Sequence, residues 1–301
     1  MSAAVSGIET GRYVETAPGI RLHCAQAGAP DAPLLLFLHG FPEFWFAWRA
    51  LLPRFADRWH AVAPDLRGFN LSSAPQAPEA YRIEALISDI DGLIHGLGHE
   101  RAVIVAHDWG GAVAWSYAMA RPQRVSRLVI LNAPHPVPFA RLLAHDAEQQ
   151  AASAYMNWLR KPEAEALLAE EDFARFDRFF VGLSPAPWFD APTRAAYHAA
   201  WSQPGALTGS LNYYRASPLY PPVGDDPGAR RLELDPAAFR VHVPTRVIWG
   251  EADTALKPSL LDGLEELVPD LSLVRLPGRS HWLVHEAPEA VSTLIREFIE
   301  P

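Results

Sequence analysis

The sequence predicts an α/β protein with a mostly parallel central sheet, helices on both faces of it, and a helical cap inserted after the strand that ends near residue 134. Two observations predict this class. Short apolar runs alternate with helical stretches over most of the 301 residues, as in strands that cross over into helices. In one long middle stretch this alternation stops, and aromatic residues and prolines are scattered through helical segments with no plausible strand. We therefore expect a core of residues 1–134 and 223–301 and a cap of residues 135–222.

The strands are expected where an apolar run is short and is bounded by turn residues. "PLLLFLHG" at 33–40 is apolar nearly throughout, as in a buried strand, and "RAVIVAHD" at 101–108 has the same character. In chain order the expected strands are 20–28, 33–40, 60–68, 101–108, 126–134, 244–253 and 271–281. The expected helices are 82–98, 109–122, which stops at Pro122, and 288–300.

The cap follows the carboxyl end of a strand, and an insertion at that edge lies over the crevice where α/β proteins bind ligands. Trp158, Trp188 and Trp201 are concentrated in this part of the chain. We interpret it as a lid over the ligand site. The alternative is a peripheral decoration of the core.

Composition limits the classes of partner and compartment. The net charge of −9 gives no electrostatic reason to expect nucleic acid or an anionic membrane as partner. Cys24 is the only cysteine, so no internal disulfide is possible, and a reducing compartment fits. "MSAAVSGIETGRYVE" at the start lacks the features of a signal peptide, and no apolar run approaches the ~20 residues that span a bilayer. We expect a cytoplasmic protein, monomeric or homodimeric, and no metal site, since the histidines lack the spacing of ligands.

The sequence from Ala106 to Gly110 has the spacing of a nucleophile elbow between a strand and a helix. The central residue of such a turn has a strained backbone, and the residues two positions away must be small, as Ala106 and Gly110 are. The central residue here is Asp108, where serine is usual. A carboxylate is already anionic and can attack saturated carbon to form an alkyl ester. Alternatively, Asp108 could merely cap the helix that follows.

Such an ester must be hydrolysed, which requires a base. His281 follows the last expected strand, where a loop histidine can reach Asp108, and it is preferred to His285 in the next turn. A histidine base needs a carboxylate that orients it and stabilises its cation. Asp253 ends the strand at 244–253 and is preferred to Glu251 for this role.

Hydrolysis also generates an oxyanion that needs N–H donors. "LHGFPEFW" at 38–45 is a turn directly after a buried strand. The backbone N–H groups of Phe41 and of Trp109, which follows the nucleophile, are the expected donors.

These residues together resemble the α/β-hydrolase-fold epoxide hydrolases over nearly the whole chain. The resemblance is most specific in "HGFPEFWFAWR" at 39–49, "PDLRGFNLSS" at 64–73, "AHDWGGAVAW" at 106–115, "NYYR" at 212–215 and "GRSHWLVHEAPEAV" at 278–291. It implies an α/β-hydrolase fold in which Asp108 is the nucleophile, His281 the base, Asp253 the orienting acid and Phe41 the first oxyanion donor.

The resemblance also implies two cap tyrosines that donate to the epoxide oxygen. One lies in an N-W-Y-R motif, which maps it onto Tyr214, with Tyr213 in place of the tryptophan. The other maps more loosely onto Tyr155. Ring opening expels an alkoxide, and phenols, with a pKa near ~10, can donate to it without being ionised at rest. Packing in an aromatic cap is the alternative role for either tyrosine.

Other functions remain open at this point. A haloalkane dehalogenase would use the same ester chemistry and hold a halide with Trp109 and a second donor such as Trp158. A non-catalytic ligand-binding homologue belongs to a different class, but it could tolerate the loss of site residues that are all present here. Fluoroacetate dehalogenase is disfavoured because arginines do not follow the nucleophile, and an esterase because the elbow carries aspartate.

The sequence therefore predicts an epoxide hydrolase that converts an apolar epoxide, with an aryl group suggested by the aromatic content, to a vicinal diol. Its partners would be the epoxide and water, with no cofactor. Besides the catalytic residues named above, we expect Trp158 and Tyr213 to contact the substrate.

Overall fold

A computed structural model describes residues 6–182 and 186–300. Three segments lie outside the described residues. They are residues 1–5, where no signal peptide is expected, residues 183–185 of the expected cap, and residue 301 of the expected core.

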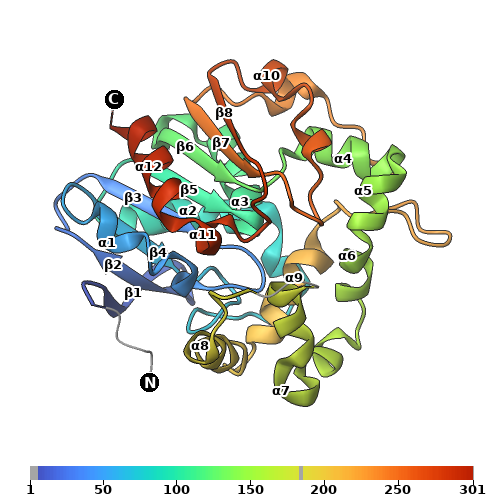
Figure 1. The fold of residues 1–301 in the computed structure, drawn as a ribbon, viewed down its shortest axis with the longest axis horizontal. Coiled ribbons are helices and arrows are strands. Elements are labelled where there is room, and N and C mark those ends of the chain that lie inside the picture. The colour runs from blue at the N-terminus through green and yellow to red at the C-terminus, as the bar shows by residue number, and fades with distance from the viewer. Residues whose placement is uncertain (1–5, 183–185, 301) are drawn as a thin grey trace.

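The core is an eight-stranded sheet with the order β1-β2-β4-β3-β5-β6-β7-β8 (Figure 1). The strands are β1 Glu9–Ala17, β2 Ile20–Ala27, β3 Leu34–Leu38, β4 His60–Pro64, β5 Ala102–His107, β6 Val125–Leu131, β7 Thr245–Gly250 and β8 Leu271–Leu276. Neighbours from β4 to β8 pair in parallel, whereas β2 is antiparallel to both β1 and β4. The predicted mostly parallel sheet and the α/β-hydrolase fold class are confirmed.

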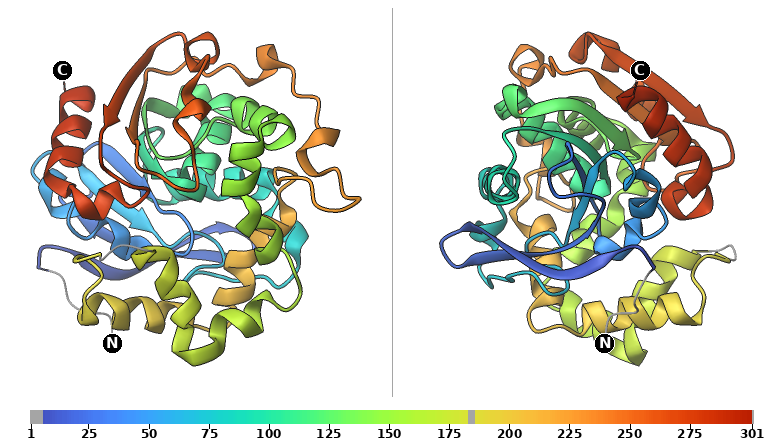
Figure 2. Two further views of the ribbon diagram at one scale, coloured as in Figure 1. Left: turned by 45° about the vertical axis from the view of Figure 1, so that its right-hand side comes forward. Right: turned by 90° about the vertical axis from the view of Figure 1, so that its left-hand side faces the viewer.

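Helices cover both faces of this sheet. The α-helices are α1 Leu52–Phe55, α2 Ile83–Gly96, α3 Asp108–Ala120, α4 Pro136–His145, α5 Ala147–Ala152, α6 Ala154–Leu159, α7 Ala164–Val181, α8 Ala191–Trp201, α9 Ala206–Ala216, α10 Leu264–Leu267, α11 Leu283–Glu286 and α12 Pro288–Ile299. Figure 2 shows α2 and α12 on opposite sides of the sheet. Every residue of β3, β4 and β5 is buried, which explains why these strands read as continuous apolar runs.

Two features of the sheet differ from the sequence-based expectation. The strand at 60–68 was expected to be longer than β4, and the strand at 271–281 longer than β8. In both cases the extra residues form the loop at the carboxyl end of the strand. Residues 65–68 are buried like a strand, whereas residues 277–281 are mostly polar and are exposed or half-buried. β1 was not expected, because this edge strand is mostly exposed and lacks an apolar run.

Helices α4 to α9, which we call the helical insertion, lie between β6 and β7. Figure 1 shows α7, α8 and α9 grouped on the side of the molecule away from β7 and β8. Within 135–182 and 186–222 the structure contains no strand, as predicted. The division into a core and a separate cap domain at 134 and 222 stays a prediction. None of the helices in the described parts of the chain has the length and apolarity to cross a membrane.

Candidate active site

Asp108 occupies a strained turn between β5 and α3. Its φ angle is +50°, in the left-handed region that few residues other than glycine adopt. A Cβ atom at Gly110 would lie 2.4 Å from the carbonyl oxygen of Leu38, and one at Gly40 would lie 2.3 Å from the Cβ of Asp108. The turn therefore depends on small residues around it, and it lifts the Asp108 carboxylate above the carboxyl edge of the sheet.

Two groups approach the two oxygens of this carboxylate. The backbone N–H of Phe41 donates to Oδ1 at 2.7 Å. The Nε2 of His281 lies 3.7 Å from Oδ2. The loop that carries Phe41 is fixed from behind by His39, whose ring accepts from the backbone N–H of Leu66 at 2.9 Å. Trp109 lies in the first turn of α3, where a backbone N–H has no intrahelical partner.

The other ring nitrogen of His281 is held by Asp253. The Nδ1 of His281 lies 2.7 Å from Asp253 Oδ2, and the Asp253 side chain is fully buried. The other Asp253 oxygen, Oδ1, accepts from the backbone N–H groups of Ala255 and Leu256 at 2.8 and 2.9 Å. The structure thus brings Asp108, His281 and Asp253 together from the ends of β5, β8 and β7.

The charges of these three side chains shift the pKa values of His281 and Asp253. Burial alone would lower the pKa of His281, but the carboxylates of Asp253 and Asp108 raise it to about 9. Burial opposes the ionisation of Asp253. The positive charge of His281 and the hydrogen bonds that Asp253 accepts nevertheless hold the pKa of this carboxyl below its usual value. The raised pKa favours the protonated form of His281 between the carboxyl groups of Asp253 and Asp108.

Tyr155 of α6 and Tyr214 of α9 line the same cavity as Asp108. Their rings contact each other edge to face, with centroids 6.2 Å apart, and Tyr214 packs in the same way on Phe41 and Trp109. Burial, together with the charge of Asp108, raises the pKa of both phenols. Both side chains are therefore protonated donors at neutral pH.

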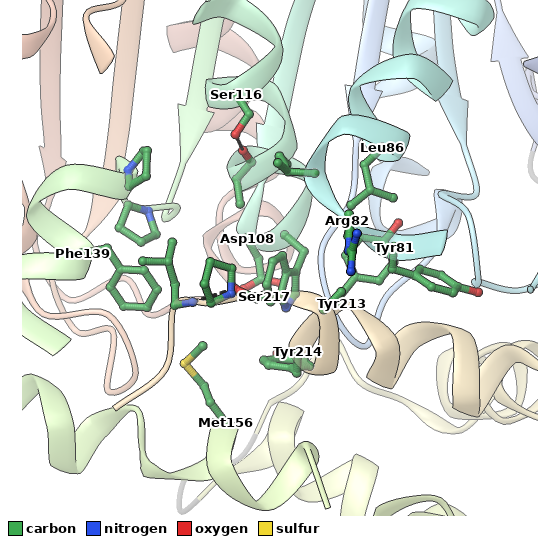
Figure 3. A pocket seen from close by; sticks show the side chains of 18 of the residues that line it. Tyr81, Arg82, Leu86, Asp108, Ser116, Phe139, Met156, Tyr213, Tyr214 and Ser217 are labelled. Atoms are coloured by element: carbon green, nitrogen blue, oxygen red, sulfur yellow. Dashed lines mark hydrogen bonds between the residues drawn. The ribbon is translucent and has the colours of Figure 1, made fainter. Parts of the chain in front are cut away.

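The cavity has a volume of about 460 Å³, within the range of small-molecule sites. Figure 3 shows Asp108 in the middle of it, with Phe139 to one side, Tyr81 and Leu86 to the other, and Tyr214 facing it from below. Most of the lining is apolar or aromatic, and its other members include Ile83, Ala112, Pro134, Met156, Leu219, Leu232, Leu234 and Phe239. The arrangement suits an apolar ligand with a reactive group at Asp108.

Only some of the remaining residues that the sequence analysis proposed for the site lie at the cavity. Tyr213 and Trp109 line the cavity, but Trp158 is not among its described lining residues; it packs instead at the edge of the hydrophobic core. The two competing residues point elsewhere: His285 Nε2 lies 2.6 Å from Glu43, and Glu251 lies 3.4 Å from Arg275. In the described chain, no group of three or more histidine, cysteine or acidic side chains could hold a metal ion.

Sequence reasoning missed Asn132, which follows β6 with a φ of +35°. Its amide donates to Asp253 Oδ2 at 2.7 Å, and its carbonyl oxygen accepts from the backbone N–H of Gly250 at 2.7 Å. Burial opposes the charge of Asp253, and this hydrogen bond helps to keep the pKa of Asp253 low. A polar residue at the end of an apolar strand, as in "LVILNAP", is the signal that could have identified it.

Sequence reasoning also missed a buried polar cluster behind the elbow. Glu43 accepts from Tyr197 of α8 at 2.8 Å and contacts His285, and its other oxygen lies 3.3 Å from the ring of His107. The second ring nitrogen of His107 lies 2.9 Å from the carbonyl oxygen of His281. Burial opposes ionisation of Glu43, but the two histidines hold its pKa well below the usual value. The cluster links the insertion, the elbow and the His281 loop.

Comparison with known proteins agrees with this geometry. A family model of the alpha/beta hydrolase fold matches residues 33–288. The chain is 39% identical to the AB hydrolase superfamily protein YfhM of Bacillus subtilis, over 94% of this chain and 95% of that protein. It is 35% identical to epoxide hydrolase 1 of Caenorhabditis elegans, over 96% of this chain and 70% of that protein.

The solved structures agree as well. The crystal structure of Bacillus megaterium epoxide hydrolase in complex with an inhibitor matches with a TM-score of 0.87 at 34% identity, over 96% of this chain and 100% of that chain. Because similarity of this extent covers both the sheet and the helical insertion, the chain belongs to the epoxide hydrolases of the α/β-hydrolase fold.

Proposed function

We propose that this protein hydrolyses an apolar epoxide to a vicinal diol through an ester on Asp108. The observation that carries the proposal is the cavity shared by the Asp108 carboxylate and the two protonated tyrosines, Tyr155 and Tyr214. A nucleophile and two oxygen donors in one apolar space are what the opening of an epoxide needs.

In the first step, Asp108 attacks one carbon of the epoxide ring. The bond between that carbon and the ring oxygen breaks, and the electron pair passes to the oxygen. Tyr155 and Tyr214 stabilise this oxygen, and one of them gives it a proton, which that tyrosine regains from water. The product of the step is a hydroxyalkyl ester of Asp108, with every atom of the epoxide retained.

In the second step, water attacks the carbonyl carbon of the ester. His281 takes the proton of that water, and Asp253 stabilises the resulting cation. The backbone N–H groups of Phe41 and Trp109 stabilise the oxyanion. The diol leaves and the Asp108 carboxylate is regenerated, so that epoxide and water balance the diol with no cofactor.

The first step prepares His281 for the second. With a pKa of about 9, His281 is largely protonated in the resting site and cannot accept a proton. Formation of the ester removes the charge of Asp108, which is one of the charges that raise this pKa. We therefore expect the pKa of His281 to fall when Asp108 is alkylated, so that a base becomes available once it is needed.

The dehalogenase alternative receives less support. It required Trp109 and a second donor such as Trp158 around a halide, and Trp158 is absent from the described lining of the cavity. Two phenols in the cavity favour an oxygen leaving group. Location in the cytoplasm and a monomeric or homodimeric state stay predictions from the sequence.

The test is a product assay with styrene oxide and, separately, 1-chlorohexane. We expect diol from the epoxide and no chloride from the chloroalkane. A single turnover in ¹⁸O-labelled water, with protein in excess, should give diol without the label, since the new oxygen comes from Asp108. Chloride release without diol would assign the protein to the dehalogenases, and no turnover of either compound would favour a binding protein.

A further inference from the structure

The two helices that carry the tyrosines are joined at their carboxyl ends by two arginines. Arg160 directly follows α6, and its guanidinium donates to the carbonyl oxygens of Tyr214 and, at 3.0 Å, Ser217 at the end of α9. Arg215 of α9 makes the reciprocal link. It donates to the carbonyl oxygen of Lys161, just beyond α6, at 2.9 Å.

Arg160 lies where a cation is favoured. The last carbonyl groups of a helix have no intrahelical partner and carry partial negative charge. Tyr214 and Ser217 belong to the last turn and the cap of α9, so Arg160 satisfies groups that α9 itself cannot. Arg160 thus stabilises the end of α9, and Arg215 ties α9 to the turn that follows α6.

The links are fixed by further contacts. Arg215 forms a two-pronged ion pair with Glu165 at the start of α7, at 2.6 and 2.8 Å. Burial opposes the charge of Glu165, but the hydrogen bond from Arg215 holds the pKa of this carboxyl below its usual value. Arg160 stacks on the ring of Tyr220 at 3.7 Å. Planar, bidentate and stacked arginines hold geometry better than mobile surface pairs.

These links bear on the distance between the two phenols. Tyr155 and Tyr214 lie on separate helices, and both hydroxyls must reach one epoxide oxygen at the same time. A displacement of about 1 Å at a reacting group can cost up to about 100-fold in rate. Tyr214 is itself adjacent to Arg215 and gives its carbonyl oxygen to Arg160.

We propose that Arg160 and Arg215 are positioning residues for ring opening, which act by holding α6 and α9 together so that Tyr155 and Tyr214 face the same oxygen. The inference rests on the proposed function. Neither arginine lines the cavity, so neither touches the substrate. Because the hydrolytic residues lie at the sheet edge, loosening the two helices should slow the first step and spare the second.

The experiment compares Arg160→Met and Arg215→Met with the unchanged protein in single-turnover, rapid-quench mass spectrometry with styrene oxide. The appearance of the Asp108 ester gives the rate of ring opening, and its decay gives the rate of hydrolysis. We expect ring opening to fall by roughly 10- to 100-fold, with hydrolysis within about twofold. Arg215→Lys, which keeps the charge but loses the two-pronged geometry, should recover part of the loss.

Arg194→Met is the matched control. Arg194 of α8 also pairs with a carboxylate in the insertion, that of Asp177 at 3.2 Å, but it has no hydrogen bond to α6 or α9 among the described residues. It should leave both steps unchanged. If a methionine variant does not fold, Glu165→Gln, which weakens only the ion pair, should show a smaller but equally selective loss.

Two results would overturn the inference while leaving the proposed function intact. The first is unchanged ring opening in both folded methionine variants. The second is an equal fall in both steps, which would indicate general damage. Failure of the unchanged protein to form diol or ester would instead overturn the proposed function itself.

Discussion

The two halves of the site are built in different ways. The proposed hydrolytic half, with Asp108, His281 and Asp253, lies at the ends of the parallel strands β5, β8 and β7, and backbone N–H groups complete it. The half proposed to open the ring consists of two tyrosine side chains on separate helices, which are joined by arginines. The comparison indicates that the sheet holds the residues of the first half in position. The positions of the two tyrosines depend instead on side-chain links that a single substitution can loosen.

The helical insertion and the core also place their positive φ angles differently. In α7, the residues Glu171, Asp172 and Phe173 have φ angles of +51°, +53° and +64°, which interrupt the helix. In the described core, positive φ angles at residues other than glycine occur at Asn70, Asp108 and Asn132, and the last two directly follow β5 and β6 within the site. Two of these three core positions therefore lie within the candidate site.

Removal of the nucleophile should have the largest effect. Asp108→Ala should lower kcat by at least about 10⁴-fold, since neither half can act without the ester. Steady-state diol formation measures this. Activity near that of the unchanged protein would contradict the roles assigned to both halves.

Loss of the phenols should separate the halves. Tyr155→Phe combined with Tyr214→Phe should slow ring opening by roughly 10²- to 10⁴-fold, because the alkoxide then lacks its donors. Hydrolysis of the ester that still forms should proceed at its normal rate in rapid-quench experiments. Slowing of both steps to the same extent would contradict the division between core and insertion.

Substitution of Asn132 should have a smaller effect, on the proposed hydrolytic half. Asn132→Ala removes a hydrogen bond to Asp253 and leaves the backbone N–H of Gly250 without its partner, which should cost about 1–3 kcal/mol of stability. We expect hydrolysis to slow by about tenfold and ring opening to be spared. Asn132→Gly is the control, since glycine tolerates the φ of +35° and isolates the loss of the amide.

The smallest effect concerns pH. The pKa of His281 is raised from 6.5 to about 9 in the folded protein, so the folded state binds this proton more tightly than the unfolded state. The resulting stabilisation is complete below pH 6.5 and is lost as the pH rises through 9. Urea unfolding of the unchanged protein and of His281→Gln should therefore give a stability difference that shrinks over this range. A difference that is constant with pH would contradict the charged state of His281.

Much of the core could be predicted from the sequence because its candidate site residues lie in short sequence motifs. The elbow around Asp108 and the turn at Phe41 are short motifs, and the carboxyl ends of parallel strands necessarily meet at one edge. Glu43 could not be found in this way, and for Asn132 the only local signal was a polar residue at the end of an apolar strand. Each acts on a residue more than 60 positions away, through the register of neighbouring strands or the packing of a loop.

The insertion was less predictable for the same physical reason. Its helical character could be predicted from composition, and Tyr214 from the single motif NYYR at 212–215. Which aromatic side chains face the cavity depends on how α6 packs, so the assignment of Trp158 to the substrate site found no support in the cavity lining. Arg160 carries no local signal, since its partners lie 54 and 57 residues further along the chain.

The most direct test of the account is the intact mass of His281→Gln after exposure to styrene oxide. Without its base, the core cannot hydrolyse the ester, while ring opening by Asp108 and the tyrosines continues. We predict an increase equal to the whole mass of the epoxide, localised to Asp108, and no such adduct when Asp108→Ala is added. A variant that turns over normally without an adduct, or an adduct on another residue, would contradict the central claim.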